Sequence, residues 1–286
     1  MGTSPSLHYQ PVAALAPGVL SAVGYHHDGL SPGIHLGIPA PSLTFIFSTQ
    51  GPIEVGASAS QATGPDAERA QVLLSRLHTD PAYVVEPGTQ AGIQMAVHPL
   101  AARALFGVPA RELDRLALEG SDVLGPDASR VLERLQDLPL GPDAFAVVRD
   151  FLHGQWQRRR PEQVRPELAQ AWRWMARTRG AGSMRDLAEH VALSQRQLST
   201  LFQREVGMAP KAIARLIRFT RARRMVAGHV ALTGSMTLAQ VAHTCGYADQ
   251  SHLVRDFQQY TGSSPTQWLQ QERQYVQAGA HVRAAG

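Results

Sequence analysis

Two stretches in the second half of the chain carry similar patterns of residues: residues 191–210, VALSQRQLSTLFQREVGMAP, and residues 246–265, GYADQSHLVRDFQQYTGSSP. Adding 55 to a residue number in the first stretch leads to a residue with the same physical role in the second. The roles are a helix cap, two core positions, a helix end and the start of the next element. The matched pairs are Ser194 and Asp249, Leu198 and Leu253, Phe202 and Phe257, Gly207 and Gly262, and Pro210 and Pro265. The chain therefore contains an internal repeat.

A short helix precedes each of the two stretches. Leu187-Ala188 matches Val241-Ala242 with an offset of 54 residues. The offset is therefore 54 before the turn and 55 after it, and the extra residue of the second copy is Ala248, in the turn. Ser194 and Gln197 have the spacing of a capping box, which predicts a helix start. Each copy thus predicts a helix, a tight turn and a capped second helix. This is the helix-turn-helix arrangement, whose second helix enters the DNA major groove; the alternative is two ordinary hairpins of an α-helical bundle.

The charge of the chain is distributed unevenly. The whole sequence has 27 Lys and Arg, 23 Asp and Glu, and a net charge of +4. Residues 1–164 hold 11 basic and 16 acidic residues (net −5), whereas residues 165–286 hold 16 basic and 7 acidic residues (net +9). A basic second half points to a polyanionic partner for that half. The single cysteine excludes a disulfide framework, a Cys-rich zinc module and an iron–sulfur cluster held by this chain alone.

A length of 286 residues suggests two domains, at ~150 residues per domain. The first half carries short apolar runs between turn-forming residues, which predict strands, followed by segments with helical spacing. The expected strands are Val19–Gly24, Leu43–Phe47 and Gly92–Val97, and the expected helices are Leu100–Phe106, Ala128–Leu135 and Phe145–Trp156. Residues 1–160 are therefore expected to form an α+β domain, with short strands first and helices later. Gln157–Pro161 is polar, contains a proline and reads as a linker.

Residues 165–270 are expected to form an all-α domain. Pro166 starts a helix whose apolar face carries Leu168, Trp172, Met175 and Ala176. Pro210 starts a long helix, running to about Ala227, that joins the two helix-turn-helix units, and Thr237–Cys245 forms a short helix. Residues 271–286 are polar and rich in Gly and Ala, which predicts a disordered tail.

The repeat resembles the DNA-binding part of the AraC/XylS family of bacterial transcription regulators. The second copy fits the family signature through Gly246–Phe257, Gly262 and Pro265, and Arg218, Ala222 and Met225-Val226 resemble the family pattern on the connecting helix. The resemblance covers residues 165–270. It implies two helix-turn-helix units on one face, held by the long helix, that enter adjacent major grooves about one turn (roughly 34 Å) apart. The loop from Ala227 to Met236 is longer than the family pattern, which puts the half-site geometry in doubt.

Residues 1–160 resemble the N-terminal domains that many such regulators carry. The resemblance implies a domain that senses a signal or pairs protomers. A small-molecule effector and a second copy of the chain are therefore candidate partners, in addition to double-stranded DNA.

The candidates for reading DNA are polar side chains that alternate with the apolar residues of each second helix. They are Gln195, Arg196, Ser199 and Thr200 in the first copy, and Gln250, Ser251, His252 and Arg255 in the second. Arg pairs with guanine, Gln with adenine, and Ser or Thr with either. The resemblance places all of these except Gln195 and His252 at positions that meet base edges in the family. The alternative is contact with phosphate or water only, or, for Arg255, a structural salt bridge.

Lys211 and Arg215, near the start of the long helix, are candidate phosphate contacts, with a solvated helix face as the alternative.

No catalytic, cofactor or metal site is expected. His26, His27 and His35 lack the clustered carboxylates of a metal site, and Cys245 reads as a buried packing residue. Neither a phosphate-binding loop nor a Gly-x-Ser-x-Gly or His-Glu-x-x-His motif occurs. The longest nearly apolar stretch, Val12–Val23, is broken by Pro17-Gly18, and a basic secretory start is lacking, so a cytoplasmic location is expected.

The sequence thus favours a sequence-specific transcriptional regulator that is not an enzyme. Two alternatives stay open: an architectural DNA-binding protein of low specificity, and a DNA-bound enzyme with its chemistry in the first half. The mixture of Gln, Ser, Thr, His and Arg on the reading faces, in place of an all-basic face, favours the regulator.

Overall fold

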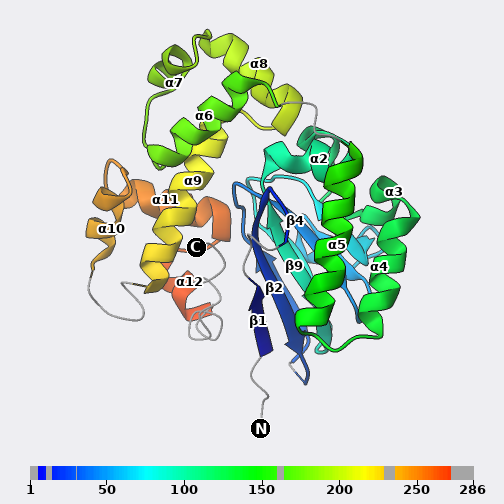
Figure 1. Cartoon of the computed structure of the whole chain (residues 1–286). Coiled ribbons are helices and arrows are strands. Elements are labelled where there is room, and N and C mark those ends of the chain that lie inside the picture. Colours follow the sequence, from blue (N-terminus) through cyan, green and yellow to red (C-terminus); the bar gives the residue numbers. More distant parts are fainter. Residues whose placement is uncertain (1–5, 11–14, 30, 160–163, 229–235, 272–286) are drawn as a thin grey trace. The chain divides into compact units, whose positions relative to one another are not determined.

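The computed structural model describes residues 6–10, 15–29, 31–159, 164–228 and 236–271 (Figure 1). The chain divides into two compact units. The first comprises residues 1–37, 42–77 and 82–162, and the second comprises residues 38–41, 78–81 and 163–286. The first unit contains the strands followed by helices, and the second is helical. The expected fold class, an α+β domain followed by an all-α domain, is therefore confirmed.

The first unit contains two antiparallel sheets. The six-stranded sheet has the order β1 (Ser6–Gln10), β2 (Val19–His27), β9 (Gln90–Val97), β4 (Leu43–Ser48), β7 (Val72–Ser75) and β10 (Leu118–Glu119). The four-stranded sheet has the order β3 (Gly33–Gly37), β8 (Ala82–Glu86), β5 (Ile53–Gly56) and β6 (Glu68–Ala70). The three expected strands correspond to β2, β4 and β9, which are adjacent in the six-stranded sheet.

Strand β4 is covered on both faces, which explains its continuous apolar sequence. The rings of Phe45 and Phe47 pack edge-on against Phe106 and Phe151, with centroid distances of 5.4 and 5.9 Å. These partners lie on helices α2 (Ala102–Phe106) and α5 (Pro142–Arg159). Ile46, between the two phenylalanines, points to the opposite face and joins a different cluster. One face of the six-stranded sheet is thus covered by helices.

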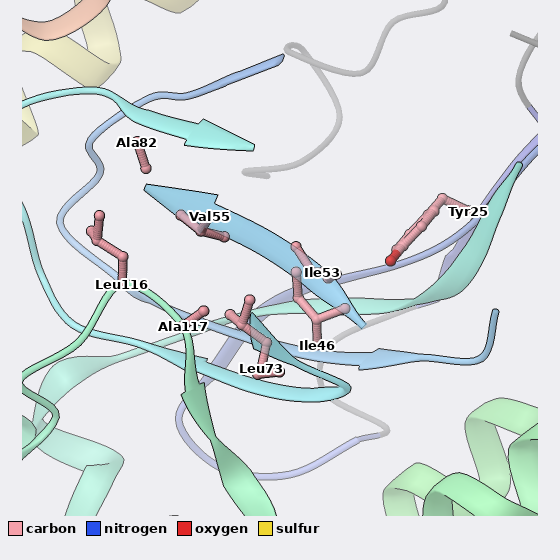
Figure 2. Packing of buried hydrophobic residues seen from close by; sticks show 9 residues of the cluster. Tyr25, Ile46, Ile53, Val55, Leu73, Ala82, Leu116 and Ala117 are labelled. Carbon is pink, nitrogen blue, oxygen red and sulfur yellow. The ribbon is translucent and has the colours of Figure 1, made fainter. Parts of the chain in front are cut away.

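The opposite face packs against the four-stranded sheet (Figure 2). The cluster between the sheets takes Ile46 and Leu73 from one sheet and Ile53 and Val55 from the other. Tyr25, on β2, lies in the same cluster, and burial raises the pKa of its hydroxyl well above the usual value. The two sheets therefore share one apolar core.

Short helices complete the first unit. Helix α1 (Ala59–Ala62) lies between β5 and β6; a 3₁₀ turn at Pro99–Ala101 leads into α2, and a second at Ala110–Glu112 follows it. Helices α3 (Gly120–Leu124) and α4 (Pro126–Gln136) precede α5. The three expected helices correspond to the first 3₁₀ turn with α2, to α4 and to α5. Gln157–Arg159, expected in a linker, instead forms the last turn of α5; residues 160–163 lie outside the described part.

The second unit consists of helices in the expected order. They are α6 (Pro166–Arg177), α7 (Met184–His190), α8 (Gln195–Val206), α9 (Pro210–Met225), α10 (Leu238–Thr244), α11 (Gln250–Thr261) and α12 (Pro265–Gln271). Helix α9 contacts α6 and α8 on one side of the repeat and α10 and α11 on the other (Figure 1). Ala176, expected on the buried face of α6, is exposed. The tail beyond Gln271 and residues 229–235 of the long loop lie outside the described residues.

Candidate nucleic-acid interface

The first helix pair, α7 and α8, is capped by side chains at both starts. Ser183 Oγ accepts a hydrogen bond from the backbone N–H of Asp186 at 3.1 Å. Ser194 Oγ accepts from the N–H of Gln197 at 3.2 Å, and Gln197 Oε1 accepts from the N–H of Ser194 at 2.9 Å. This reciprocal pair is the capping box that the sequence predicts. It fixes where the second helix begins, and hence which residues occupy its first turn.

The second pair, α10 and α11, repeats this arrangement. Thr237 and Gln240 form a capping box at α10, and Asp249 Oδ1 accepts from the N–H of His252 at 2.7 Å at the start of α11. Gly207 and Gly262 end α8 and α11 with φ of 78° and 69°. These φ values lie in the left-handed region, which glycine adopts readily.

The turn within each pair also contains a left-handed residue. It is Ala192 (φ 54°) in the first pair and Gly246 (φ 74°) in the second, 54 positions apart. A Cβ atom built on Gly246 would lie 2.9 Å from the Cβ of Ala181. Glycine suits the second turn for two reasons: it adopts the left-handed conformation without the strain that Ala192 carries in the first turn, and a Cβ atom would be too close to Ala181.

Replacing Gly246 with alanine is expected to lower the free energy of unfolding by about 1–2 kcal/mol, because strain and the clash add. Gly262→Ala is the matched control: its φ is 69°, but nothing lies within 4 Å of a Cβ there. Urea unfolding followed by tryptophan fluorescence measures both variants. We expect a larger loss for Gly246→Ala than for Gly262→Ala, and equal losses would show that the contact with Ala181 has no effect.

In each helix-turn-helix unit an aromatic pair joins the recognition-type helix to the helix that precedes the pair. These are α8 with α6 in the first unit and α11 with α9 in the second. Trp172 on α6 stacks on Phe202 of α8, with centroids 6.3 Å apart and planes at 7°. Phe219 on α9 packs edge-on against Phe257 of α11, with centroids 5.2 Å apart. The repeat is thus a three-helix unit, α6–α8 and then α9–α11. The residues expected in the core of these units, Leu198, Phe202, Leu253 and Phe257, are all buried.

The candidate reading residues of α8 lie on its exposed side. Gln195, Arg196 and Thr200 are exposed and Ser199 is half-buried. Thr200 Oγ1 donates to the backbone oxygen of Arg196 at 3.0 Å, so its hydroxyl oxygen is left to accept a further hydrogen bond. This face therefore presents donors and acceptors together.

The candidates of α11 differ in exposure. Gln250, Ser251 and Arg255 are exposed. His252 is half-buried, and its ring packs edge-on against Tyr247 at 5.1 Å. Within the described ranges Arg255 makes no ion pair, so the alternative of a structural salt bridge finds no support there.

The two candidate phosphate contacts, Lys211 and Arg215, differ in their surroundings. Lys211 is exposed on the first turn of α9. Arg215 instead binds a buried carboxylate, since its Nε and Nη2 donate to Asp256 Oδ1 at 2.9 and 2.7 Å. Arg215 therefore has an internal partner, and its expected contact with phosphate stays a prediction.

Two further arginines of α9, Arg218 and Arg221, also have internal contacts, which the sequence did not predict. Arg221 Nη1 donates to the backbone oxygen of Thr244 at 2.6 Å, at the end of α10. The guanidinium carbon of Arg218 lies 4.6 Å from the ring centroid of Tyr247. Burial raises the pKa of Tyr260, which lies beneath Arg215, to about 12. Only the positive charge of this helix is visible in the sequence, because the partners lie 23 to 41 residues away.

Cys245 is buried and its thiol contacts Met225 Sδ at 3.5 Å. Burial raises the pKa of the thiol, which disfavours the reactive thiolate. Over the residues that the structure describes, no group of three or more His, Cys, Asp or Glu side chains could hold a metal ion. In the same part of the chain no helix is both long and apolar enough to cross a membrane.

Comparison with known proteins agrees with this geometry. Residues 187–271, which span α7 to α12, match the family model described as "Helix-turn-helix domain". Residues 187–271 form a helix-turn-helix domain. The match confirms the resemblance that the motifs of the two copies indicate, and this helix-turn-helix domain contains all ten candidate residues.

The helix-turn-helix domain is also similar to parts of two curated proteins from Pseudomonas aeruginosa. The transcriptional regulator GbdR is 32% identical over 80 residues, which cover 28% of this chain and 20% of GbdR. The transcriptional regulator ArgR is 26% identical over 88 residues, which cover 31% of this chain and 25% of ArgR. The matched region thus spans between a fifth and a quarter of the length of these relatives.

Solved structures with low sequence identity are similar in part. ToxT from Vibrio cholerae is 10% identical, with a TM-score of 0.48 over 93% of this chain and 98% of ToxT. The DNA-binding domain of AdpA in complex with a target DNA is 24% identical, with a TM-score of 0.32 over 42% of this chain and 98% of that domain. The assignment of the helix-turn-helix domain rests on the family match and on the geometry of the two units.

Proposed function

We propose that this chain is a sequence-specific, DNA-binding transcriptional regulator. The observation that carries the proposal is the repeated unit: two capped second helices, 55 positions apart, each buried along one face and polar along the other. A helix of this kind inserts its polar face into the major groove and reads base edges. Two copies in one domain would read two adjacent grooves.

Charge supports the same proposal. Residues 165–286 have a net charge of +9, so phosphate attraction would favour binding to any DNA sequence. Specificity would come from Gln195, Arg196, Ser199 and Thr200 on α8, and from Gln250, Ser251, His252 and Arg255 on α11. Lys211 would contact phosphate. Because His252 packs against Tyr247, its contribution would be smaller than that of its exposed neighbours.

The first unit would have a regulatory role, sensing a signal or pairing two chains. It has its own core between two sheets, and residues 1–164 have a net charge of −5. A negative unit is repelled by phosphate and so would leave DNA binding to the helical unit. A small molecule or a second copy of the chain would act through this first unit.

The proposal is tested by selecting duplexes from randomised DNA with the full chain at ~150 mM salt, where non-specific phosphate binding is weakened. We expect a motif with two short conserved blocks about one helical turn, roughly 34 Å, apart. Binding without any enriched motif would contradict a sequence-specific regulator and favour the architectural alternative.

Replacing Arg255 with alanine should lower affinity for the selected duplex by ~5- to 150-fold, because a bidentate contact with guanine provides about 1–3 kcal/mol. The preference at one base pair should relax at the same time. Arg149→Ala, which removes an exposed arginine from α5 of the first unit, is the matched control and should leave the affinity unchanged. Titration of labelled duplexes by fluorescence anisotropy measures both. A uniform loss on all sequences, with every base preference retained, would show that Arg255 contacts phosphate only.

A further inference from the structure

A buried carboxylate joins three elements of the second helix-turn-helix unit. Asp256, on α11, is fully buried. Its Oδ1 accepts two hydrogen bonds from Arg215 of α9, and its Oδ2 accepts one from the hydroxyl of Tyr247, in the turn, at 3.0 Å. The carboxylate therefore ties the second helix both to the connecting helix and to the turn before it.

Aromatic rings enclose the same group. The guanidinium carbon of Arg215 lies 5.1 Å from the ring centroid of Tyr260, also on α11. Arg218, one turn further along α9 than Arg215, lies over the ring of Tyr247. Two cation–π contacts thus accompany the ion pair, and all of them connect α9 to the second helix pair. We call Arg215, Tyr247 and Asp256 the Asp256 network.

The first helix-turn-helix unit (α6–α8) has apolar residues at the two positions that are charged in the second (α9–α11). Arg215 lies four residues before the aromatic residue of its long helix, Phe219, and Leu168 lies four residues before Trp172. Asp256 directly precedes Phe257, and Leu201 directly precedes Phe202. Leu168 and Leu201 are both buried. One repeat therefore has two leucines where the other has an ion pair.

This difference has a physical consequence. Apolar contacts are non-directional and tolerate small rotations of a helix. A guanidinium that donates two hydrogen bonds to one carboxylate oxygen has a defined geometry, which a rotated helix would lose. Asp256 is next to Arg255, which lies on the same exposed face as Ser251, four residues earlier. Fixing the rotation of α11 through Asp256 therefore fixes where Ser251 and Arg255 point.

We propose that Asp256 and Arg215 are positioning residues that set the orientation of the second recognition helix and so determine sequence discrimination in one half of the DNA site. This inference rests on the proposed function. It assigns the network a role in specificity, beyond its role in stability. The first recognition helix, without such a network, would not depend on these residues.

The test places the leucines of the first helix-turn-helix unit at the matching positions of the second. The double variant Arg215→Leu/Asp256→Leu replaces the ion pair with the two leucines found in the first helix-turn-helix unit, a change that often leaves stability intact. Affinities of the full-length chain are measured for the selected duplex and for duplexes altered in one block at a time. Circular dichroism and urea unfolding report whether the fold is kept.

We expect the folded double variant to keep its discrimination in the block read by α8. Discrimination in the block read by α11 should fall by ~10-fold or more, within the range that one bidentate base contact supplies. A double variant that folds and keeps wild-type discrimination in both blocks would overturn the positioning role. Wild-type protein with no sequence preference would reject the proposed function itself, and the positioning role with it.

Arg215→Lys provides a second test if the double variant does not fold. Lysine keeps the charge opposite Asp256 but loses the planar fork. We expect ~3-fold or greater loss of discrimination in the block read by α11 with little change in the urea midpoint, because that discrimination depends on the fork. Unchanged discrimination would overturn the proposal. The control Arg69→Gln/Glu54→Gln removes an ion pair of the four-stranded sheet and should change neither block.

Discussion

Replacing Phe257 with alanine is expected to lower the free energy of unfolding of the helical unit by about 3–5 kcal/mol. The ring is fully buried and packs against Phe219 at 5.2 Å and Trp268 at 5.6 Å. It therefore joins α9, α11 and α12, and truncation would leave a cavity where three helices meet. Helix α11 would be affected first, so specific DNA binding should be lost at temperatures where the first helix-turn-helix unit, α6–α8, is still folded.

Urea unfolding followed by tryptophan fluorescence measures this loss, since three of the four tryptophans, Trp172, Trp174 and Trp268, belong to the helical unit. Phe202→Ala is the matched variant in the other repeat, where the ring stacks on Trp172, and we expect a loss of similar size. A loss below about 1 kcal/mol for Phe257→Ala would contradict the packing described here.

The second large effect is the dependence of the stability of the N-terminal α+β unit on pH. Burial lowers the pKa of His98 to about 4, so its imidazole is neutral in the folded chain. Its Nδ1 accepts a hydrogen bond from the backbone N–H of Leu100 at 3.1 Å, at the start of a 3₁₀ turn. Protonation would convert this acceptor into a donor and break the cap.

Because the pKa of His98 is lower in the folded state than the ~6.5 of an unfolded chain, the unfolded state takes up the proton first. The contribution of His98 to the free energy of unfolding is fully present above about pH 7. It falls by roughly 2–3 kcal/mol in all as the pH decreases from about 6.5 to 4. His98→Asn keeps a capping acceptor without the titration. Urea unfolding from pH 7 to pH 4, followed by circular dichroism, should therefore show a shallower fall for the variant. Parallel curves would contradict a buried, neutral His98.

The repeat allowed most of the helical unit to be predicted from the sequence. Caps, helix ends and buried faces recur 54 or 55 positions apart, and each is a local signal. Ser194 with Gln197 predicts a helix start wherever it occurs, and the structure has that capping box. The exposed reading faces follow from the buried ones, because a helix that buries Leu198 and Phe202 must expose the residues between them.

The first unit was less predictable for physical reasons. Strands β2, β4 and β9 contain the mainly apolar stretches of five or six residues, beside turn formers, that predicted them. Strands such as β6 and β10 have three and two residues, and their sequences carry no recognisable period. They form because neighbouring strands supply hydrogen-bond partners. The backbone N–H of Ala117 next to β10, for example, donates to the carboxylate of Glu68 on β6 at 2.8 Å.

The Asp256 network was not predictable for a related reason. Arg215 lies on a basic helix, and its sequence neighbourhood is typical of a solvated or phosphate-binding face. Its partner lies 41 residues away, and nothing local in the sequence indicates that Asp256 is buried. Comparison of the two repeats does contain a signal, since Leu168 and Leu201 occupy the matching positions.

DNA selection repeated with Arg196→Ala and Arg255→Ala, one from each repeat, beside the wild-type chain tests whether the two repeats read separate grooves. If the two units read DNA separately, each variant will lose base preference in one block only, and the two variants will affect different blocks about one helical turn apart. Loss of preference in the same block with both variants, or unchanged motifs with both, would contradict an account in which two repeated helices read two grooves.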